Sequence, residues 1–73
     1  MKSAFFLYLR SEYRQGELHR GVRLIEAGAR GQPRRVIANL PEITGNDAIA
    51  DQRFAQALDE GHRMLVGLRG GAA

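Results

Sequence analysis

The sequence predicts an α+β fold, in which a three-stranded antiparallel sheet is followed by one packed helix in the order β-β-β-α. Three short segments alternate apolar and polar residues, as half-buried strands do, and residues typical of turns separate them. A proline ends the third segment, and apolar residues at helical spacing follow it. Because 73 residues leave room for one core, we expect a single small domain over residues 1–69 and a frayed tail over residues 70–73.

The first expected strand runs from Ser3 to Tyr13 and is rich in phenylalanine, leucine and tyrosine. These residue types favour strands, and the alternation of apolar and polar residues begins at Leu7. Residues 14–17 predict a turn after this strand, since Gly16 can adopt a positive φ angle without steric cost.

The second and third expected strands are Gly21 to Ala27 and Arg34 to Leu40. Two glycines and a proline within residues 28–33 mark the break between them. Pro41 ends the third strand, because proline has no N–H group to donate to a neighbouring strand.

The helix is expected after a short connector, with Asn46 or Asp47 as its N-cap. Apolar or small residues then recur at steps of three and four, which is the spacing of one helix face. These residues are Ala50, Phe54, Leu58, Gly61, Leu65 and Leu68. Within a helix Gly61 costs about 1 kcal/mol relative to alanine, unless it lets the helix approach the sheet closely.

Apolar side chains of the first strand, the third strand and the helix are expected to hold the two layers together. They are Phe5, Leu7, Val36, Phe54, Leu58 and Leu65. We also expect Phe6 and Tyr8 in the core, although rings exposed on a sheet can stack on nucleic-acid bases.

A small all-α bundle is the alternative fold. Four apolar residues between Tyr13 and Ile25 recur at steps of five, four and three, and Gly28 stands where many helices end. A helix through the second expected strand therefore stays open at this point.

The composition gives no support to an enzyme, a metal site or a cofactor site. Without cysteine there is no disulfide framework and no thiolate ligand. His19, expected in a turn, and His62, expected on the helix, are far apart in sequence and are expected to face solvent. No serine or threonine has a base at a telling spacing. We therefore expect a protein that is not an enzyme and that carries no cofactor.

The apolar content also argues against a membrane protein. The apolar run at residues 4–9 is too short for a signal peptide, and no segment reaches the ~20 apolar residues of a membrane span. We expect a soluble, cytoplasmic protein that does not contact membranes.

The charge is unevenly distributed along the chain. Residues 1–39 carry eight basic and three acidic residues, whereas residues 40–73 carry three basic and five acidic residues. Ten of the eleven basic residues are arginine, whose planar guanidinium suits bidentate contacts with phosphates and bases, although a GC-rich genome would also favour it. A basic first half predicts a surface that faces a polyanion.

Nucleic-acid binding is the function that this pattern favours, with duplex DNA as the expected partner. Strand alternation places some of the arginines on sheet faces, where they can read guanine in the major groove, and the others near turns, where they can hold phosphates. The candidate residues are Arg10, Arg14, Arg20, Arg23, Arg30, Arg34 and Arg35. A charged face that serves only solubility is the plain alternative.

The stretch LIEAGARGQPRRVIANLPE resembles the N-terminal segment of DDE-type insertion-sequence transposases, and the likeness extends over roughly residues 5–45. The residues that fall on that family's pattern are Leu24, Ile25, Glu26, Arg30, Gly31, Arg34, Arg35, Val36, Ile37, Ala38, Asn39 and Leu40. The resemblance implies a small sheet-plus-helix region that contacts DNA through Arg23, Arg30, Arg34 and Arg35. Pro41 stands where the family favours glycine, and no Asp-Asp-Glu catalytic domain follows, so we expect a detached or domesticated module, or a fragment.

Two other roles stay open. A small adaptor or inhibitor of phage or mobile-element type would dock on a host protein, through the Phe-Tyr-rich first strand or through the helix. A structural homodimer would form along the apolar seam of the helix. Only the nucleic-acid role predicts affinity that falls steeply with salt.

Overall fold

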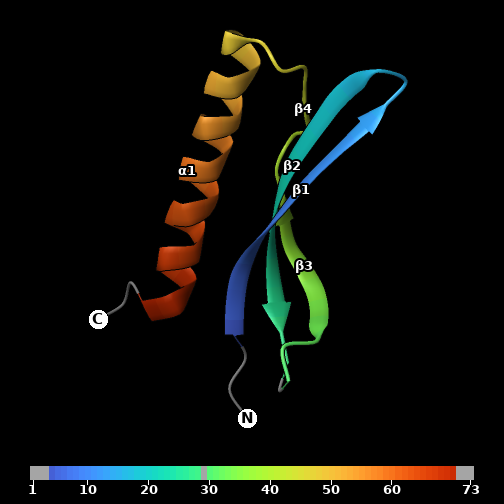
Figure 1. The fold of residues 1–73 in the computed structure, drawn as a ribbon. Coiled ribbons are helices and arrows are strands. Elements are labelled where there is room, and N and C mark those ends of the chain that lie inside the picture. The colour runs from blue at the N-terminus through green and yellow to red at the C-terminus, as the bar shows by residue number, and fades with distance from the viewer. Residues whose placement is uncertain (1–3, 29, 71–73) are drawn as a thin grey trace.

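The computed structural model describes residues 4–28 and 30–70, apart from the side chain of Arg34. The elements are β1 (Ala4–Arg14), β2 (Glu17–Ala27), β3 (Pro33–Asn39), β4 (Ile43–Thr44) and α1 (Ala48–Gly70) (Figure 1). The predicted three strands and C-terminal helix are confirmed, and the all-α alternative is wrong. The two-residue strand β4, which pairs with β2, was not predicted.

The long strand β2 is the centre of the sheet. β1 pairs antiparallel with it along its whole length on one side. β3 and β4 share its other side, where β3 pairs with residues 23–27 of β2 and β4 pairs with residues 19–20. β1 is therefore an edge strand, and the turn end of its hairpin with β2 slants away from α1 in Figure 1.

The hairpin turn explains why β2 begins earlier than predicted. Gln15 and Gly16 both have positive φ angles, 52° and 82°, which is the conformation of a two-residue type I′ turn. Arg14 consequently pairs directly with Glu17, and β2 starts at Glu17 rather than at Gly21. The prediction that Gly16 enables the turn is confirmed.

β3 is shifted by one residue from the prediction and is irregular. It runs from Pro33 to Asn39, and its pairing with β2 changes register twice, which is the mark of β-bulges. Val36 lies opposite Ile25 while Ala38 lies opposite Leu24, so these two β3 residues do not share a face. Val36 is exposed, and the prediction that it holds the helix is wrong.

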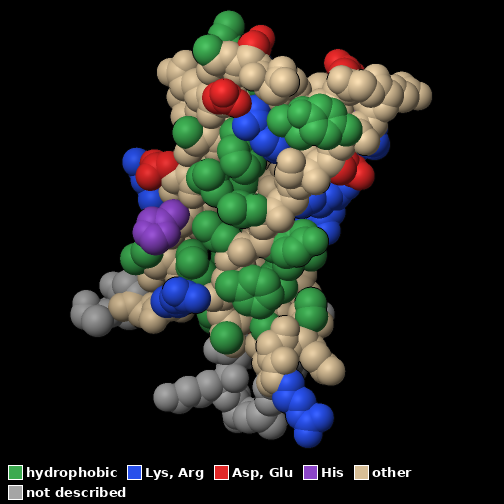
Figure 2. Space-filling view, viewed as in Figure 1, with side chains coloured by type: hydrophobic (Ala, Val, Ile, Leu, Met, Phe, Trp, Pro, Cys, Tyr) green, Lys and Arg blue, Asp and Glu red, His purple; other side chains and the backbone are tan. Residues whose placement is uncertain are grey.

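α1 packs against β1, β2 and β4 on one face of the sheet and does not reach β3. Gly61 is buried at this contact, where an added Cβ would lie 3.1 Å from Leu7 Cδ2 and 3.1 Å from Val22 Cγ1. Gly61 thus allows the close approach of helix and sheet that the sequence left open. Figure 2 shows apolar side chains along the seam between the two layers.

The buried core is small and is built mainly from β2 and α1. It consists of Val22, Leu24, Ile25, Ala27, Ala50 and Leu65. Phe5, Leu7, Phe54 and Leu58 are half-buried around it. Leu68, expected on the helix seam, is exposed because it lies near the C-terminal end of α1.

Of the two predicted N-caps, Asp47 caps the helix: its Oδ1 accepts a hydrogen bond from the Ala50 amide at 2.8 Å. α1 continues to Gly70, so the expected tail begins one residue too early, and the rest of it, residues 71–73, lies outside the described residues. Within the described residues, no helix combines the length and apolar character needed to cross a bilayer.

Candidate nucleic-acid interface

The sheet has one face that α1 does not cover, here called the open face. Leu7 and Val22 point toward the helix, so alternation turns even-numbered side chains of β1 and odd-numbered side chains of β2 to the opposite side. They include Phe6, Tyr8, Arg10, Glu12, Arg14, Glu17, His19, Arg23 and Ile25, joined by Val36 of β3.

An apolar groove occupies the half of the open face near the start of β1. It has a volume of about 460 Å³ and is called the open groove. Its lining consists of Phe6, Tyr8, Arg23, Ile25, Pro33 and Val36. Ile25 is buried, whereas Tyr8 is 47 % exposed. The prediction that Tyr8 belongs to the core is wrong, because strand alternation places Tyr8 on the face of the sheet that α1 does not cover.

Arg23 is the cation of the open groove. It stands directly across from Tyr8 in the register of β1 and β2. It makes no hydrogen bond or ion pair with any described residue, although its side chain is half-buried. A cation beside an accessible aromatic ring can hold a phosphate while the ring receives a base.

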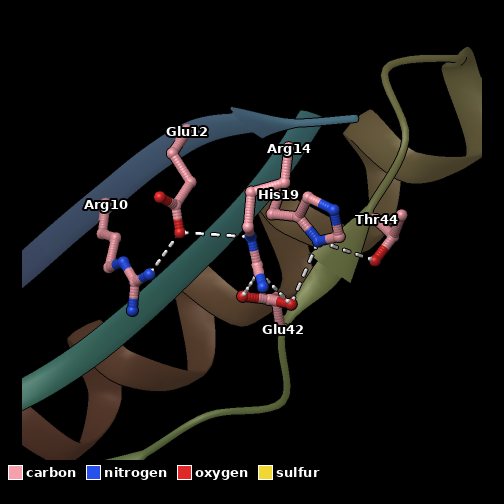
Figure 3. A network of polar contacts seen from close by, with 6 residues as sticks. All are labelled: Arg10, Glu12, Arg14, His19, Glu42 and Thr44. Atoms are coloured by element: carbon pink, nitrogen blue, oxygen red, sulfur yellow. Dashed lines mark hydrogen bonds and ion pairs between the residues drawn. The ribbon is translucent and has the colours of Figure 1, made fainter. Parts of the chain in front are cut away.

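The other half of the open face, toward the hairpin turn, carries a network of ion pairs (Figure 3). Glu12 contacts both Arg10 and Arg14. Arg14 also reaches Glu42, in the connector before β4, with Nη2 3.0 Å from Oε2. Because each arginine faces a carboxylate, Arg10 and Arg14 offer less positive charge than the sequence alone suggests.

His19 joins this network through Glu42. Its Nδ1 lies 3.1 Å from Glu42 Oε1, and its side chain is only 15 % exposed. The expectation of a solvent-facing histidine in a turn is wrong, because the early start of β2 places His19 in the sheet. The hydrogen bond with His19, and then the charge of Arg14, hold the pKa of Glu42 below its ordinary value of 4.5, against an opposing effect of desolvation.

Arg20 lies on the other face, under α1. Its Nη2 is 2.8 Å from Asp51 Oδ1 and donates to the carbonyl of Gly45 at 2.9 Å, while its guanidinium sits 5.0 Å from the centre of the Phe54 ring. The side chain is mostly buried. Arg20 therefore connects β2 to the loop after β4 and to the helix, and we leave it out of the candidate interface.

The remaining predicted arginines lie around β3. Arg35 forms an ion pair with Glu26, with 2.6 Å between Nε and Oε1. Arg30 is exposed in the connection between β2 and β3 and has no ion pair with a described residue. The side chain of Arg34 lies outside the description. The structure thus leaves Arg23 and Arg30 unpaired among the described candidates.

No known protein family, curated protein or solved structure matches this chain. The resemblance to transposase N-terminal segments therefore stays a prediction from the residues quoted above. Among the described side chains, no three histidines or carboxylates lie close enough together to hold a metal ion.

Proposed function

We propose that this protein is a non-enzymatic nucleic-acid-binding module that receives its ligand in the open groove. The observation that carries the proposal is the pairing of Tyr8, half exposed, with Arg23, which has no partner among the described residues. The groove supplies an aromatic surface for a base and a cation for the adjoining phosphate.

The same geometry favours a strand with unpaired bases. Stacking of a base on an aromatic side chain contributes about 1–3 kcal/mol, and it requires the base to be out of a duplex. Phe6 and Ile25 line the same groove as Tyr8, so a base stacked on this ring would also have apolar side chains close by.

Duplex DNA, the partner expected from the sequence, is the less favoured ligand. That expectation counted seven arginines together, whereas Arg10, Arg14, Arg20 and Arg35 are ion-paired within the molecule. Exposed ion pairs are worth only about 0–1 kcal/mol and can open. Each opened pair, however, leaves a carboxylate that repels the incoming phosphate.

The test is fluorescence anisotropy with a labelled single strand and with the duplex of the same sequence. Tyr8→Ala is expected to weaken single-strand binding about 5- to 150-fold, the equivalent of one lost stacking contact. Tyr8→Phe keeps the ring and should bind as the parent does. Arg23→Ala should weaken binding, whereas Arg53→Ala, which removes an exposed cation of α1 that has no ion pair with a described residue, is the matched control.

Three results would contradict the proposal. They are no binding of either oligonucleotide at low salt, unchanged affinity in both Tyr8→Ala and Arg23→Ala, and equal losses in Arg23→Ala and Arg53→Ala. Tighter binding of the duplex would favour duplex DNA, the partner that the sequence predicts. An adaptor that binds a host protein stays the second prediction, and salt-independent binding to a protein would favour it.

A further inference from the structure

The outer edge of β1 offers a regular row of backbone hydrogen-bonding groups. In a two-residue hairpin the residues flanking the turn form a hydrogen-bonded pair, here Arg14 and Glu17. Pairs of this kind recur at every second position in an antiparallel ladder. The even-numbered residues of β1 therefore bond to β2, and the odd-numbered residues turn their N–H and C=O groups outward.

The contacts of α1 agree with this assignment and limit the free part of the edge. Arg69, at the end of the helix, donates to the carbonyl of Phe5 from Nε at 3.1 Å and from Nη2 at 2.7 Å. From Leu7 to Tyr13 no described group bonds to the edge. This stretch contains no proline and no bulge, two devices that usually prevent strands from pairing with other chains.

Two exposed apolar side chains flank the free edge. Leu9 is 53 % and Tyr13 is 68 % exposed, and both point to the helix side of the sheet. On the open face the same stretch carries charges of alternating sign, with Glu12 between Arg10 and Arg14. A strand that ran antiparallel to β1 and carried the same sequence would match both patterns.

We propose that two copies of this chain associate through the edges of β1, antiparallel, with Ser11 of each copy on the twofold axis. In this register Arg10 lies opposite Glu12 of the second copy, and Leu9 lies opposite Tyr13. Each of these contacts occurs twice because the interface is symmetric. Cross-strand ion pairs and apolar pairs of this kind stabilise antiparallel sheets.

The neighbouring registers are less suitable. With Leu9 on the axis, Phe5 would have to bond to the second copy, and its carbonyl is already bonded to Arg69. With Arg10 on the axis the two copies of Arg10 would face each other. With Glu12 on the axis, two carboxylates would meet in the same way. Like charges directly opposite each other destabilise a sheet.

The proposed dimer has one continuous sheet. Edge-to-edge pairing of this kind places the twofold axis perpendicular to the sheet, so both helices lie on one face and both open grooves on the other. The interface covers residues 8–14 of β1, with Arg14 of the second copy opposite Tyr8, whereas the groove extends from Tyr8 across β2 to β3. Dimerisation therefore leaves the groove accessible.

The first test is sedimentation velocity at protein concentrations up to about 1 mM, in the range where weak specific complexes are half formed. The parent chain should sediment as a dimer at the higher concentrations. Ser11→Pro should be monomeric, because proline removes an outward N–H group without removing a bond to β2. Ser11→Ala keeps that N–H group and should dimerise as the parent does.

The second test asks whether Arg10 and Glu12 pair between two chains as well as within one chain. Arg10→Glu and Glu12→Arg each place like charges opposite each other, so each variant alone should self-associate about 10-fold more weakly or worse. An equimolar mixture of the two restores opposite charges at every cross-strand position and should form a heterodimer. Circular dichroism checks that each variant is folded, and if either is not, the two Ser11 variants decide.

The proposal is overturned if the parent chain stays monomeric at about 1 mM. It is also overturned if Ser11→Pro dimerises as strongly as Ser11→Ala, or if the folded charge variants do not associate when mixed. A dimer that persists in Ser11→Pro, in Arg10→Glu and in Glu12→Arg would form along the apolar seam of the helix instead.

Discussion

Raising the salt concentration measures how many arginines the nucleic acid contacts. On a single strand, each phosphate contact contributes about −0.7 to the slope of log affinity against log salt. The structure leaves Arg23 and Arg30 unpaired among the described candidates, and the sequence adds Arg34. Two or three contacts predict that affinity falls roughly 7- to 20-fold between about 50 and 200 mM salt.

Duplex binding through all seven arginines predicts a very different result. Each duplex contact contributes about −0.9 to the slope, so seven contacts lower the affinity by roughly 6,000-fold over the same salt range. The assay is anisotropy of a labelled strand of about 10 nucleotides, a typical site size, titrated at several salt concentrations.

If the affinity falls by thousands of fold over this salt range, the ion pairs of Arg10, Arg14 and Arg35 open on binding. The interface would then not be confined to the unpaired arginines. Binding without any salt dependence would mean that no phosphate is contacted. As an internal check, Glu12→Gln releases Arg10 and should make the slope steeper.

Three further outcomes follow from the packing and the charges. Gly61→Val should lower the free energy of unfolding in urea by about 1–3 kcal/mol, because its branched side chain meets the packed sheet. Gly67→Ala, in open space on the same helix, should raise it by about 1 kcal/mol. Arg20→Ala should cost about 1–3 kcal/mol through its lost hydrogen bonds. The native pKa of Glu42 is lowered, so its stabilising effect is present above about pH 4.5 and is lost as the pH falls through the native value. The stability of Glu42→Gln should therefore fall less steeply than that of the parent chain as the pH is lowered, in a pH series monitored by circular dichroism.

Local rules predicted the parts of the fold that depend on neighbouring residues. The glycine turn, the N-cap at Asp47 and the helical spacing around Gly61 are all settled within a few positions of the chain, and the structure confirms each of them. The bulges of β3 were not predictable in this way, because they arise from fitting a short strand beside β2. They place Val36 on the open face instead of under the helix.

The candidate site was harder to predict, since it depends on which charges meet in space. Strand alternation was enough to place Glu12 beside Arg10 on one face, whereas Arg14, expected in the turn, joins them because β1 extends to Arg14. Nothing local indicated that Glu42, in a connector 28 residues after Arg14, would reach the same cluster. The number of arginines in the first half of the chain therefore overstated the positive charge that is available to a ligand.

The two proposals together predict a dependence on the length of the nucleic acid. In the proposed dimer both open grooves lie on one face, so a strand of about 30 nucleotides can enter both, whereas one of about 8 nucleotides fills only one. Linked binding of this kind can strengthen affinity by 10² or more without any new contact, given roughly that span. Ser11→Pro, which should be monomeric, is expected to bind the short strand as the parent does and to lose the advantage of the long one. If Ser11→Pro binds the long strand as tightly as the parent, the two grooves do not act together, whatever the oligomeric state.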